Sequence, residues 1–149
     1  MALNPDLVGR TYPPSPVYQV GREKVREFAR AIGESSPLCL DVAAARAAGY
    51  SDLVAPPTFA IVISFEAGRQ AVFDPDLGLD YTRVVHGEQT FEYTRPIVAG
   101  DELVCVASIH AVREAAGNDI LTTRGDISTV AGEHVCTTYS VLVSRGPDV

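Results

Sequence analysis

The spacing of hydrophobic and polar residues predicts helices in the first half of the chain. Residues 21–30 place charged side chains on one helical stripe and apolar side chains on another, because residues three or four apart share a helix face. An alanine-rich segment over 41–48 reads as a short helix, with Asp41 and Gly49 as its start and stop signals. Turn formers at 33–37 end the first helix and begin a loop before the second.

Residues 56–73 predict the longest helix. The segment opens with two prolines, which suit a helix's first turn because the N–H groups there have no intrahelical partner. Between Phe59 and Phe65 it is apolar on all sides, which is typical of a helix enclosed by other structure. The β-branched run 61–63 would equally suit a strand, but the length and the polar residues after Phe65 favour a helix.

From residue 83 onward, β-branched and aromatic residues separated by turn residues predict four strands, over 83–95, 102–114, 119–130 and 133–144. A short strand over 17–20 is also predicted, after a proline-rich segment over 11–18 that favours an extended backbone. Helices followed by an antiparallel meander that wraps the long helix indicate an α+β domain. The open edges of such a sheet predict a dimer, because unpaired edge N–H and C=O groups attract another strand.

Composition indicates one globular domain over residues 1–149, since 46% of the residues are hydrophobic and 21% are charged. The net charge of -7 argues against nucleic acid or an anionic membrane as a partner. The N-terminus has neither the basic nor the apolar region of a signal peptide, and no segment is long enough to cross a bilayer. A cytoplasmic location is therefore expected.

No cofactor or metal is predicted. The sequence has no Walker loop, no Gly-x-Gly-x-x-Gly after a strand, no Gly-x-Ser-x-Gly and no His-Glu-x-x-His. The cysteines lie far apart without a Cys-x-x-Cys pair and are expected to be buried thiols, at Cys39, Cys105 and Cys136. The histidines are interpreted as structural or surface residues, at His86, His110 and His134.

One basic stripe stands out in this acidic chain, formed by Arg22, Arg26 and Arg30 on the first predicted helix. The interpretation we favour is the solvated face of an amphipathic helix. The alternative is contact with a ligand that carries phosphopantetheine.

Three segments resemble the hydratase motif of MaoC-like proteins, which runs Gly-Asp-x-Asn-Pro-(Ile/Leu)-His, then Ala-Gly, then Ile-Ala-His-Gly-(Met)-Leu. Here the first part is Gly33-Glu34-Ser35-Ser36-Pro37-Leu38-Cys39, followed by Ala48-Gly49 and by Val54-Ala55-Pro56-Pro57-Thr58-Phe59. The chain is most similar to the non-catalytic subunit of heterodimeric (3R)-hydroxyacyl-ACP dehydratases of actinobacteria, through residues 18–27, 53–59, 95–101 and 112–114. The resemblance implies a hot-dog fold, in which a curved antiparallel β-sheet wraps around a long central helix.

The motif is altered at three positions that carry the family's chemistry. Glu34 stands at the position of the catalytic Asp, and a displaced carboxylate costs about a hundredfold in rate for a shift of about 1 Å. Cys39 stands at the position of the catalytic His, and a thiol with an ordinary pKa of about 8.5 is a poor base. Pro57 aligns with the glycine whose N–H polarises the thioester carbonyl, and proline has no N–H. Ordinary structural roles, a loop carboxylate and a buried small side chain, also suit Glu34 and Cys39.

The leading hypothesis is a subunit of a hydroxyacyl-thioester dehydratase, a hydro-lyase, that is inactive alone. A paralogous MaoC-like partner would supply the Asp and His, and this chain would bind the acyl chain of an acyl-CoA or acyl-ACP through Thr58, Phe59, Val62 and Ile63. A second hypothesis is a homodimeric dehydratase or thioesterase with altered chemistry that uses Glu34 or Glu66. A third is a non-enzymatic acyl-CoA or acyl-ACP binding protein.

Overall fold

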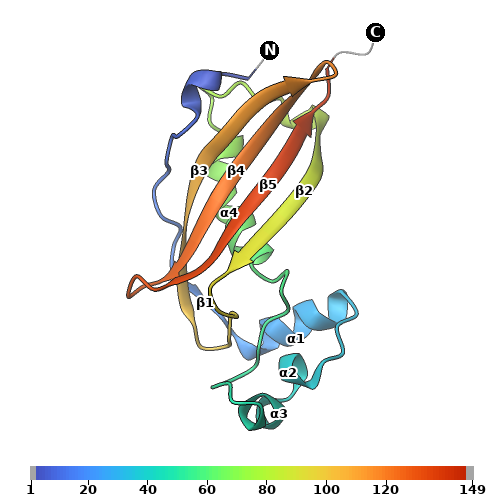
Figure 1. The fold of residues 1–149 in the computed structure, drawn as a ribbon, viewed down its shortest axis with the longest axis vertical. Coiled ribbons are helices and arrows are strands. Elements are labelled where there is room, and N and C mark those ends of the chain that lie inside the picture. The colour runs from blue at the N-terminus through green and yellow to red at the C-terminus, as the bar shows by residue number, and fades with distance from the viewer. Residues whose placement is uncertain (1–2, 147–149) are drawn as a thin grey trace.

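A five-stranded antiparallel sheet curves around one long helix (Figure 1). The computed structural model describes residues 3–146, so both ends of the expected 1–149 domain lie outside the described residues. The strands lie in the order β1-β3-β4-β5-β2 across the sheet. They are β1 (Tyr18–Gln19), β2 (Val84–Tyr93), β3 (Glu102–Ala115), β4 (Asn118–Thr129) and β5 (His134–Ser144). The predicted architecture of a curved antiparallel sheet around a long helix is confirmed.

The α-helices all precede the four long strands. They are α1 (Arg22–Ala31), α2 (Pro37–Leu40), α3 (Val42–Ala47) and α4 (Ile61–Val72), and short 3-10 helices cover Pro5–Leu7 and Tyr81–Arg83. The first three α-helices lie together at one end of the sheet, whereas α4 runs along its inner face (Figure 1). Asp41 caps α3 as predicted, because its Oδ1 accepts the Ala43 N–H at 2.9 Å. Within residues 3–146, no helix is long and apolar enough to cross a membrane.

Two local predictions were wrong. The long helix begins at Ile61 and not at the prolines, because the carbonyls of Pro56 and Thr58 accept turn bonds from N–H groups three residues ahead, at 2.9 and 3.1 Å. The loop expected before residue 41 contains the single helical turn α2. Ser36 Oγ caps this turn by accepting the Leu38 N–H at 3.3 Å, and proline occupies its first position.

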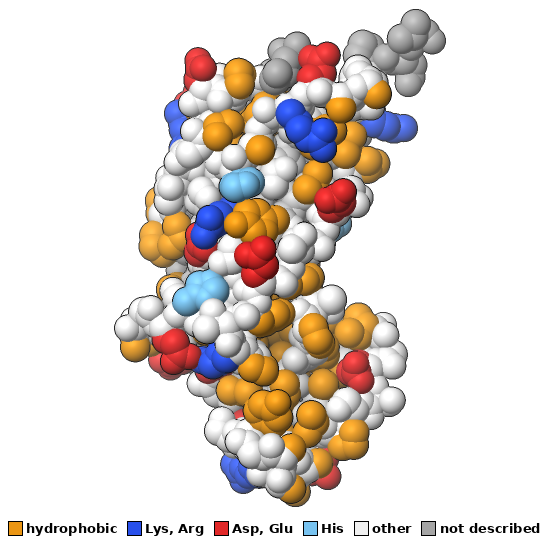
Figure 2. All heavy atoms as spheres, viewed as in Figure 1, with side chains coloured by type: hydrophobic (Ala, Val, Ile, Leu, Met, Phe, Trp, Pro, Cys, Tyr) orange, Lys and Arg blue, Asp and Glu red, His pale blue; other side chains and the backbone are white. Residues whose placement is uncertain are grey.

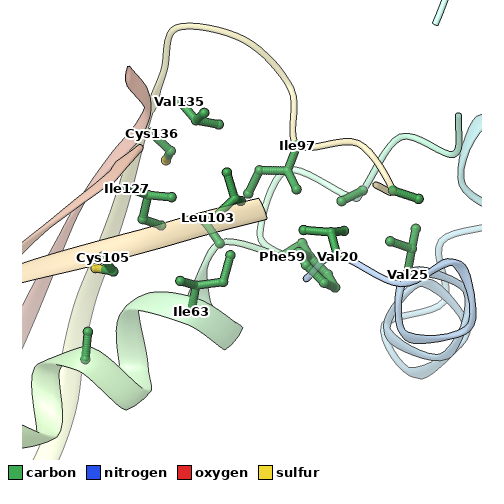
Figure 3. Close-up of a cluster of buried hydrophobic side chains, with 14 of the residues drawn as sticks. Val20, Val25, Phe59, Ile63, Ile97, Leu103, Cys105, Ile127, Val135 and Cys136 are labelled. Carbon is green, nitrogen blue, oxygen red and sulfur yellow. The ribbon is translucent and has the colours of Figure 1, made fainter. Parts of the chain in front are cut away.

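The main core lies between α4 and the inner face of β3 and β4. Ile63 on α4 points toward Leu103 and Ile127 of the sheet, as Figure 3 shows, and all three side chains are buried. Gly125 on β4 permits the close approach of α4, since a Cβ at this position would lie 3.3 Å from the Cβ of Ser64. A close helix-to-sheet contact therefore fixes α4 over β3 and β4.

The two edges of the sheet differ. Beyond the short β1, the N-terminal segment follows the outer edge of β3, where the N–H groups of Gly9, Tyr12 and Ser15 donate to β3 carbonyls at 2.8 to 2.9 Å. At the other edge, β2 pairs with β5 on one side only among the described residues. Large apolar side chains are exposed near this second edge, at Phe65, Phe73, Tyr81 and Val85. The edge formed by β2 is therefore the one available to another strand.

Candidate functional site

A cavity of about 490 Å³ lies where the helical segment meets the end of β2. Its walls come from three parts of the chain, within 34–39, 54–57 and 93–97. Figure 2 shows the molecule narrowing between the sheet and the helical segment, with hydrophobic side chains gathered around this narrowing. We call this cavity the waist cavity. Glu34, Cys39 and Pro57, the three altered motif positions, all line it.

The Glu34 carboxylate is bound to its own turn. Its Oε1 accepts the backbone N–H of Ser36 at 2.9 Å, and the side chain is half-buried. Gly33 turns the chain at this point with a φ of 74°, a conformation that glycine adopts without strain. The hydrogen bond to Ser36 orients the carboxylate along the loop, which is the arrangement expected of a structural turn residue.

The Cys39 thiol is enclosed in α2, with 5% of the residue exposed. Burial raises the pKa of the Cys39 thiol, and the neighbouring Glu34 carboxylate raises it further. Both causes act against the thiolate, so Cys39 stays protonated at neutral pH. A protonated thiol cannot remove a proton from water or from a thioester substrate.

The Tyr93 side chain bonds to the turn that precedes α4. Its hydroxyl donates to the carbonyl oxygen of Pro57 at 2.5 Å. Burial raises the pKa of the Tyr93 phenol, so it remains a donor. Ala60 is the N-cap of α4 and has no side chain that could cap the helix, and the Tyr93 hydroxyl from β2 holds the turn before the helix through the Pro57 carbonyl.

Arg95 lies in the 93–97 wall of the waist cavity and holds this wall in place. Its guanidinium forms two hydrogen bonds to the carboxylate of Asp101, at 2.9 and 3.0 Å, and also contacts Glu133. The same Asp101 carboxylate accepts the N–H of Val98 at 2.9 Å. These bonds hold the loop after β2 against the 54–57 wall, where the N–H of Ala55 donates to the backbone carbonyl of Ile97 at 2.8 Å.

A second cavity of about 340 Å³ runs along α4, on the side that faces β2 and β5, and we call it the α4 cavity. Its helix wall is formed by Ile61, Ser64, Phe65, Gly68, Arg69, Val72 and Phe73. The four residues predicted to hold an acyl chain line neither of these two cavities. Phe59 and Ile63 are core residues with 0% and 3% exposure, Val62 packs against the core, and Thr58 is exposed in the turn before α4.

The remaining polar residues singled out in the sequence lie outside the waist cavity. His86 lines the α4 cavity, and His110 packs edge-to-face on Tyr139. His134 lies between the hydroxyls of Thr94 and Thr137. Within residues 3–146, no group of three or more His, Cys, Asp or Glu side chains is placed to hold a metal ion.

Two of the three arginines of the basic stripe are already paired. Arg22 binds Asp52 at 2.7 Å, and Arg26 contacts Glu23 and the carbonyl of Leu40. Their charge is therefore largely compensated within the chain. The pairing favours the solvated-face interpretation over contact with a phosphorylated ligand.

Residues 6–138 match the family model described as "FAS1-like, dehydratase domain region". The chain is 53% identical to UPF0336 protein SCO4636 of Streptomyces coelicolor, over 99% of each chain. It superposes on a MaoC-like dehydratase with a TM-score of 0.88 and 38% identity, covering 95% of this chain and 43% of that one, so the match spans less than half of that structure. It also superposes on a chain of the C-terminally truncated HadBC (3R-hydroxyacyl-ACP dehydratase) complex of Mycobacterium tuberculosis, with a TM-score of 0.78 and 35% identity over 89% and 92% of the two chains.

Proposed function

This chain belongs to the FAS1-like dehydratase family, with the hot-dog fold of MaoC-like dehydratases and hydratases of (R)-hydroxyacyl thioesters, and we propose that it is the acyl-binding subunit of such an enzyme. In this proposal the chain is inactive alone. A paralogous partner supplies the catalytic Asp and His, and the two chains together dehydrate a (3R)-hydroxyacyl thioester.

The observation that carries the proposal is the state of the waist cavity. A hydratase needs a base to activate water and a donor to polarise the thioester carbonyl. Here the Glu34 carboxylate is bound to its own turn, Cys39 is a protonated thiol, and Pro57 has no N–H. The groups that would perform the chemistry are therefore absent or already bonded within the fold.

The α4 cavity supports an acyl-binding role. Its wall includes apolar side chains such as Ile61, Phe65 and Leu142, and its volume of about 340 Å³ lies in the range of small-molecule sites. We place the acyl chain along the side of α4 that carries Ile61 and Phe65. Thr58, Phe59, Val62 and Ile63 would then position the helix behind this cavity, and Phe59 and Ile63 would do so from the core.

The open edge of β2 supports a partner chain. The unpaired backbone groups of β2 lie beside exposed apolar side chains, including Phe65 and Val85. Pairing with a strand of another chain would satisfy the backbone groups of β2 and bury the apolar side chains. The similar HadBC structure is itself a complex, in agreement with this arrangement.

The test is hydration of an enoyl-CoA by the chain purified alone and after co-expression with a MaoC-like partner from the same organism. We expect negligible turnover from the chain alone and activity from the copurified complex. Glu34→Ala should leave the turnover of the complex within about twofold of the unsubstituted complex, since its carboxylate serves the turn. Full activity of the lone chain, abolished by Glu34→Ala, would instead establish a homodimeric enzyme with altered chemistry.

A further inference from the structure

Three side chains with hydrogen-bonding groups cross the inner face of the sheet in one row. Thr123 on β4 lies opposite Ser140 on β5, and Ser140 lies opposite Gln89 on β2. Directly opposed residues of antiparallel strands place their side chains on the same face of the sheet. Thr123 and Ser140 both line the α4 cavity, so the row runs beneath that cavity.

Two more hydroxyls adjoin the row. Ser64 on α4 and Thr138 on β5 also line the α4 cavity, and both lie next to Gly125. A Cβ built at Gly125 would lie 2.7 Å from Thr138 Oγ1 and 3.3 Å from the Cβ of Ser64. Because Gly125 has no side chain, Ser64 on α4 and Thr138 on the neighbouring strand β5 can both approach this point of the cavity wall.

Several of these polar groups have no protein partner within the described part of the chain. The side-chain nitrogen of Gln89 is buried without a hydrogen bond, while its oxygen lies 3.2 Å from His86 Nε2. Thr123 is 7% exposed, and no hydrogen bond reaches its hydroxyl or the hydroxyls of Ser64 and Ser140 among residues 3–146. Buried polar groups without partners are unfavourable, and a saturated hydrocarbon chain would desolvate them without replacing the lost bonds.

Apolar residues lie on both sides of this row. Ile61 precedes Ser64 on α4, and Leu142 follows Ser140 on the same face of β5. Val72 and Phe73 close the far end of the helix wall. A ligand that fills the cavity would therefore meet apolar side chains on both sides of the row, while Arg69, Arg124 and His86 also form part of the cavity wall.

We propose that the α4 cavity takes an acyl chain that carries a hydroxyl or keto group in its interior, remote from the thioester end. The oxygen would bond to the hydroxyl of Thr123, the buried residue of the row that lines the cavity. This inference rests on the proposed function, because it assumes that the acyl chain lies in the α4 cavity. It adds a substrate class, since dehydration of a (3R)-hydroxyacyl thioester requires only the hydroxyl at carbon 3 and no second oxygen further along the acyl chain.

The test compares the affinity of the full chain for dodecanoyl-CoA with its affinity for hydroxydodecanoyl-CoA thioesters whose hydroxyl is moved one carbon at a time along the chain. Isothermal titration calorimetry is used, and it is repeated on the complex if a partner copurifies. We expect one hydroxyl position to bind roughly tenfold or more tighter than dodecanoyl-CoA, the effect of one additional buried hydrogen bond. Thr123→Val, which keeps the shape but removes the hydroxyl, should reduce that preference toward unity.

Thr122→Val is the matched control, since Thr122 is the neighbouring threonine on the opposite face of β4 and should leave the preference unchanged. If dodecanoyl-CoA binds as tightly as every hydroxylated thioester, the inference is overturned while the acyl-binding function stands. A preference that survives in Thr123→Val also overturns it, because the row would not be its source. Absence of binding by all the thioesters, to the chain and to the complex, overturns the proposed function and this inference with it.

Discussion

Gly125 is the position where a single added methyl group tests the packing on the inner face of the sheet, beneath α4. In Gly125→Ala the new Cβ would lie 2.7 Å from Thr138 Oγ1 and 3.1 Å from Cys105 Sγ. Both neighbours are buried, with 2% and 0% exposure, so neither moves freely. Overpacking of this kind costs about 1–3 kcal/mol, and replacing a strand glycine by alanine recovers about 0.5–1 kcal/mol. We expect a net loss of about 1–2 kcal/mol in the free energy of unfolding.

Urea denaturation followed by circular dichroism measures this loss, and the melting temperature should fall by about 2–8 °C for a domain of this size. Gly68→Ala is the control, because a Cβ at Gly68 meets nothing within 4 Å and an alanine within α4 should stabilise the helix by about 0.5–1 kcal/mol. The double substitution Gly125→Ala with Thr138→Ala removes the closest clash, so its cost should be smaller than the sum of the single costs. Equal or greater stability of Gly125→Ala would refute the close packing of Thr138 and Cys105 around Gly125.

Two further substitutions test contacts between distant parts of the chain. Tyr93→Phe removes the hydroxyl that bonds the Pro57 carbonyl in the turn before α4, so the free energy of unfolding from urea titration should fall by about 0.5–1.5 kcal/mol, whereas an unchanged value would contradict this contact. The Tyr12 hydroxyl, 2.6 Å from Asp74, holds the pKa of Asp74 below its usual value. The Asp74 carboxylate therefore stabilises the fold above pH of about 4, and this contribution is lost as the pH falls through the lower folded-state pKa. Urea midpoints should show Asp74→Asn less stable than the unsubstituted chain at pH 7 and equal to it near pH 2, and a gap that does not depend on pH would contradict the assignment.

The strands could be predicted closely because their signals are local. The fourth predicted strand, 133–144, is observed as β5 (His134–Ser144), and the third, 119–130, as β4 (Asn118–Thr129). Alternating apolar residues and glycine-containing turns within a few positions determine these limits. The turn α2 also had a local signal, a capping serine followed by proline, but its four residues are too few to produce a periodic pattern.

Features that depend on contacts between distant segments could not be predicted. Tyr93 joins Pro57 across 36 positions, and no pattern near either residue indicates that the helix start is held by a phenol. The N-terminal segment was expected to be extended, but its bonds to β3 join residues about a hundred positions apart. The apolar run of α4 predicted an enclosed helix correctly. It could not show that Phe59 and Ile63 face the core while Ile61 and Phe65 border a cavity.

The two cavities differ in how their polar groups are bonded, and this difference separates their roles. In the waist cavity the polar side chains have partners in the chain itself: Glu34 binds Ser36, Tyr93 binds Pro57, and the nearby Arg95 binds Asp101. Such bonds stabilise the fold and leave nothing to act on a ligand. In the α4 cavity, the hydroxyl of Thr123 makes no hydrogen bond among residues 3–146, and at the end of the same row the side-chain nitrogen of Gln89 is buried without a partner. Groups that reduce stability in this way are characteristic of functional sites, where a ligand completes their bonds. Under the proposed function, the altered motif would serve the local turn, and the α4 cavity would hold the substrate's acyl chain.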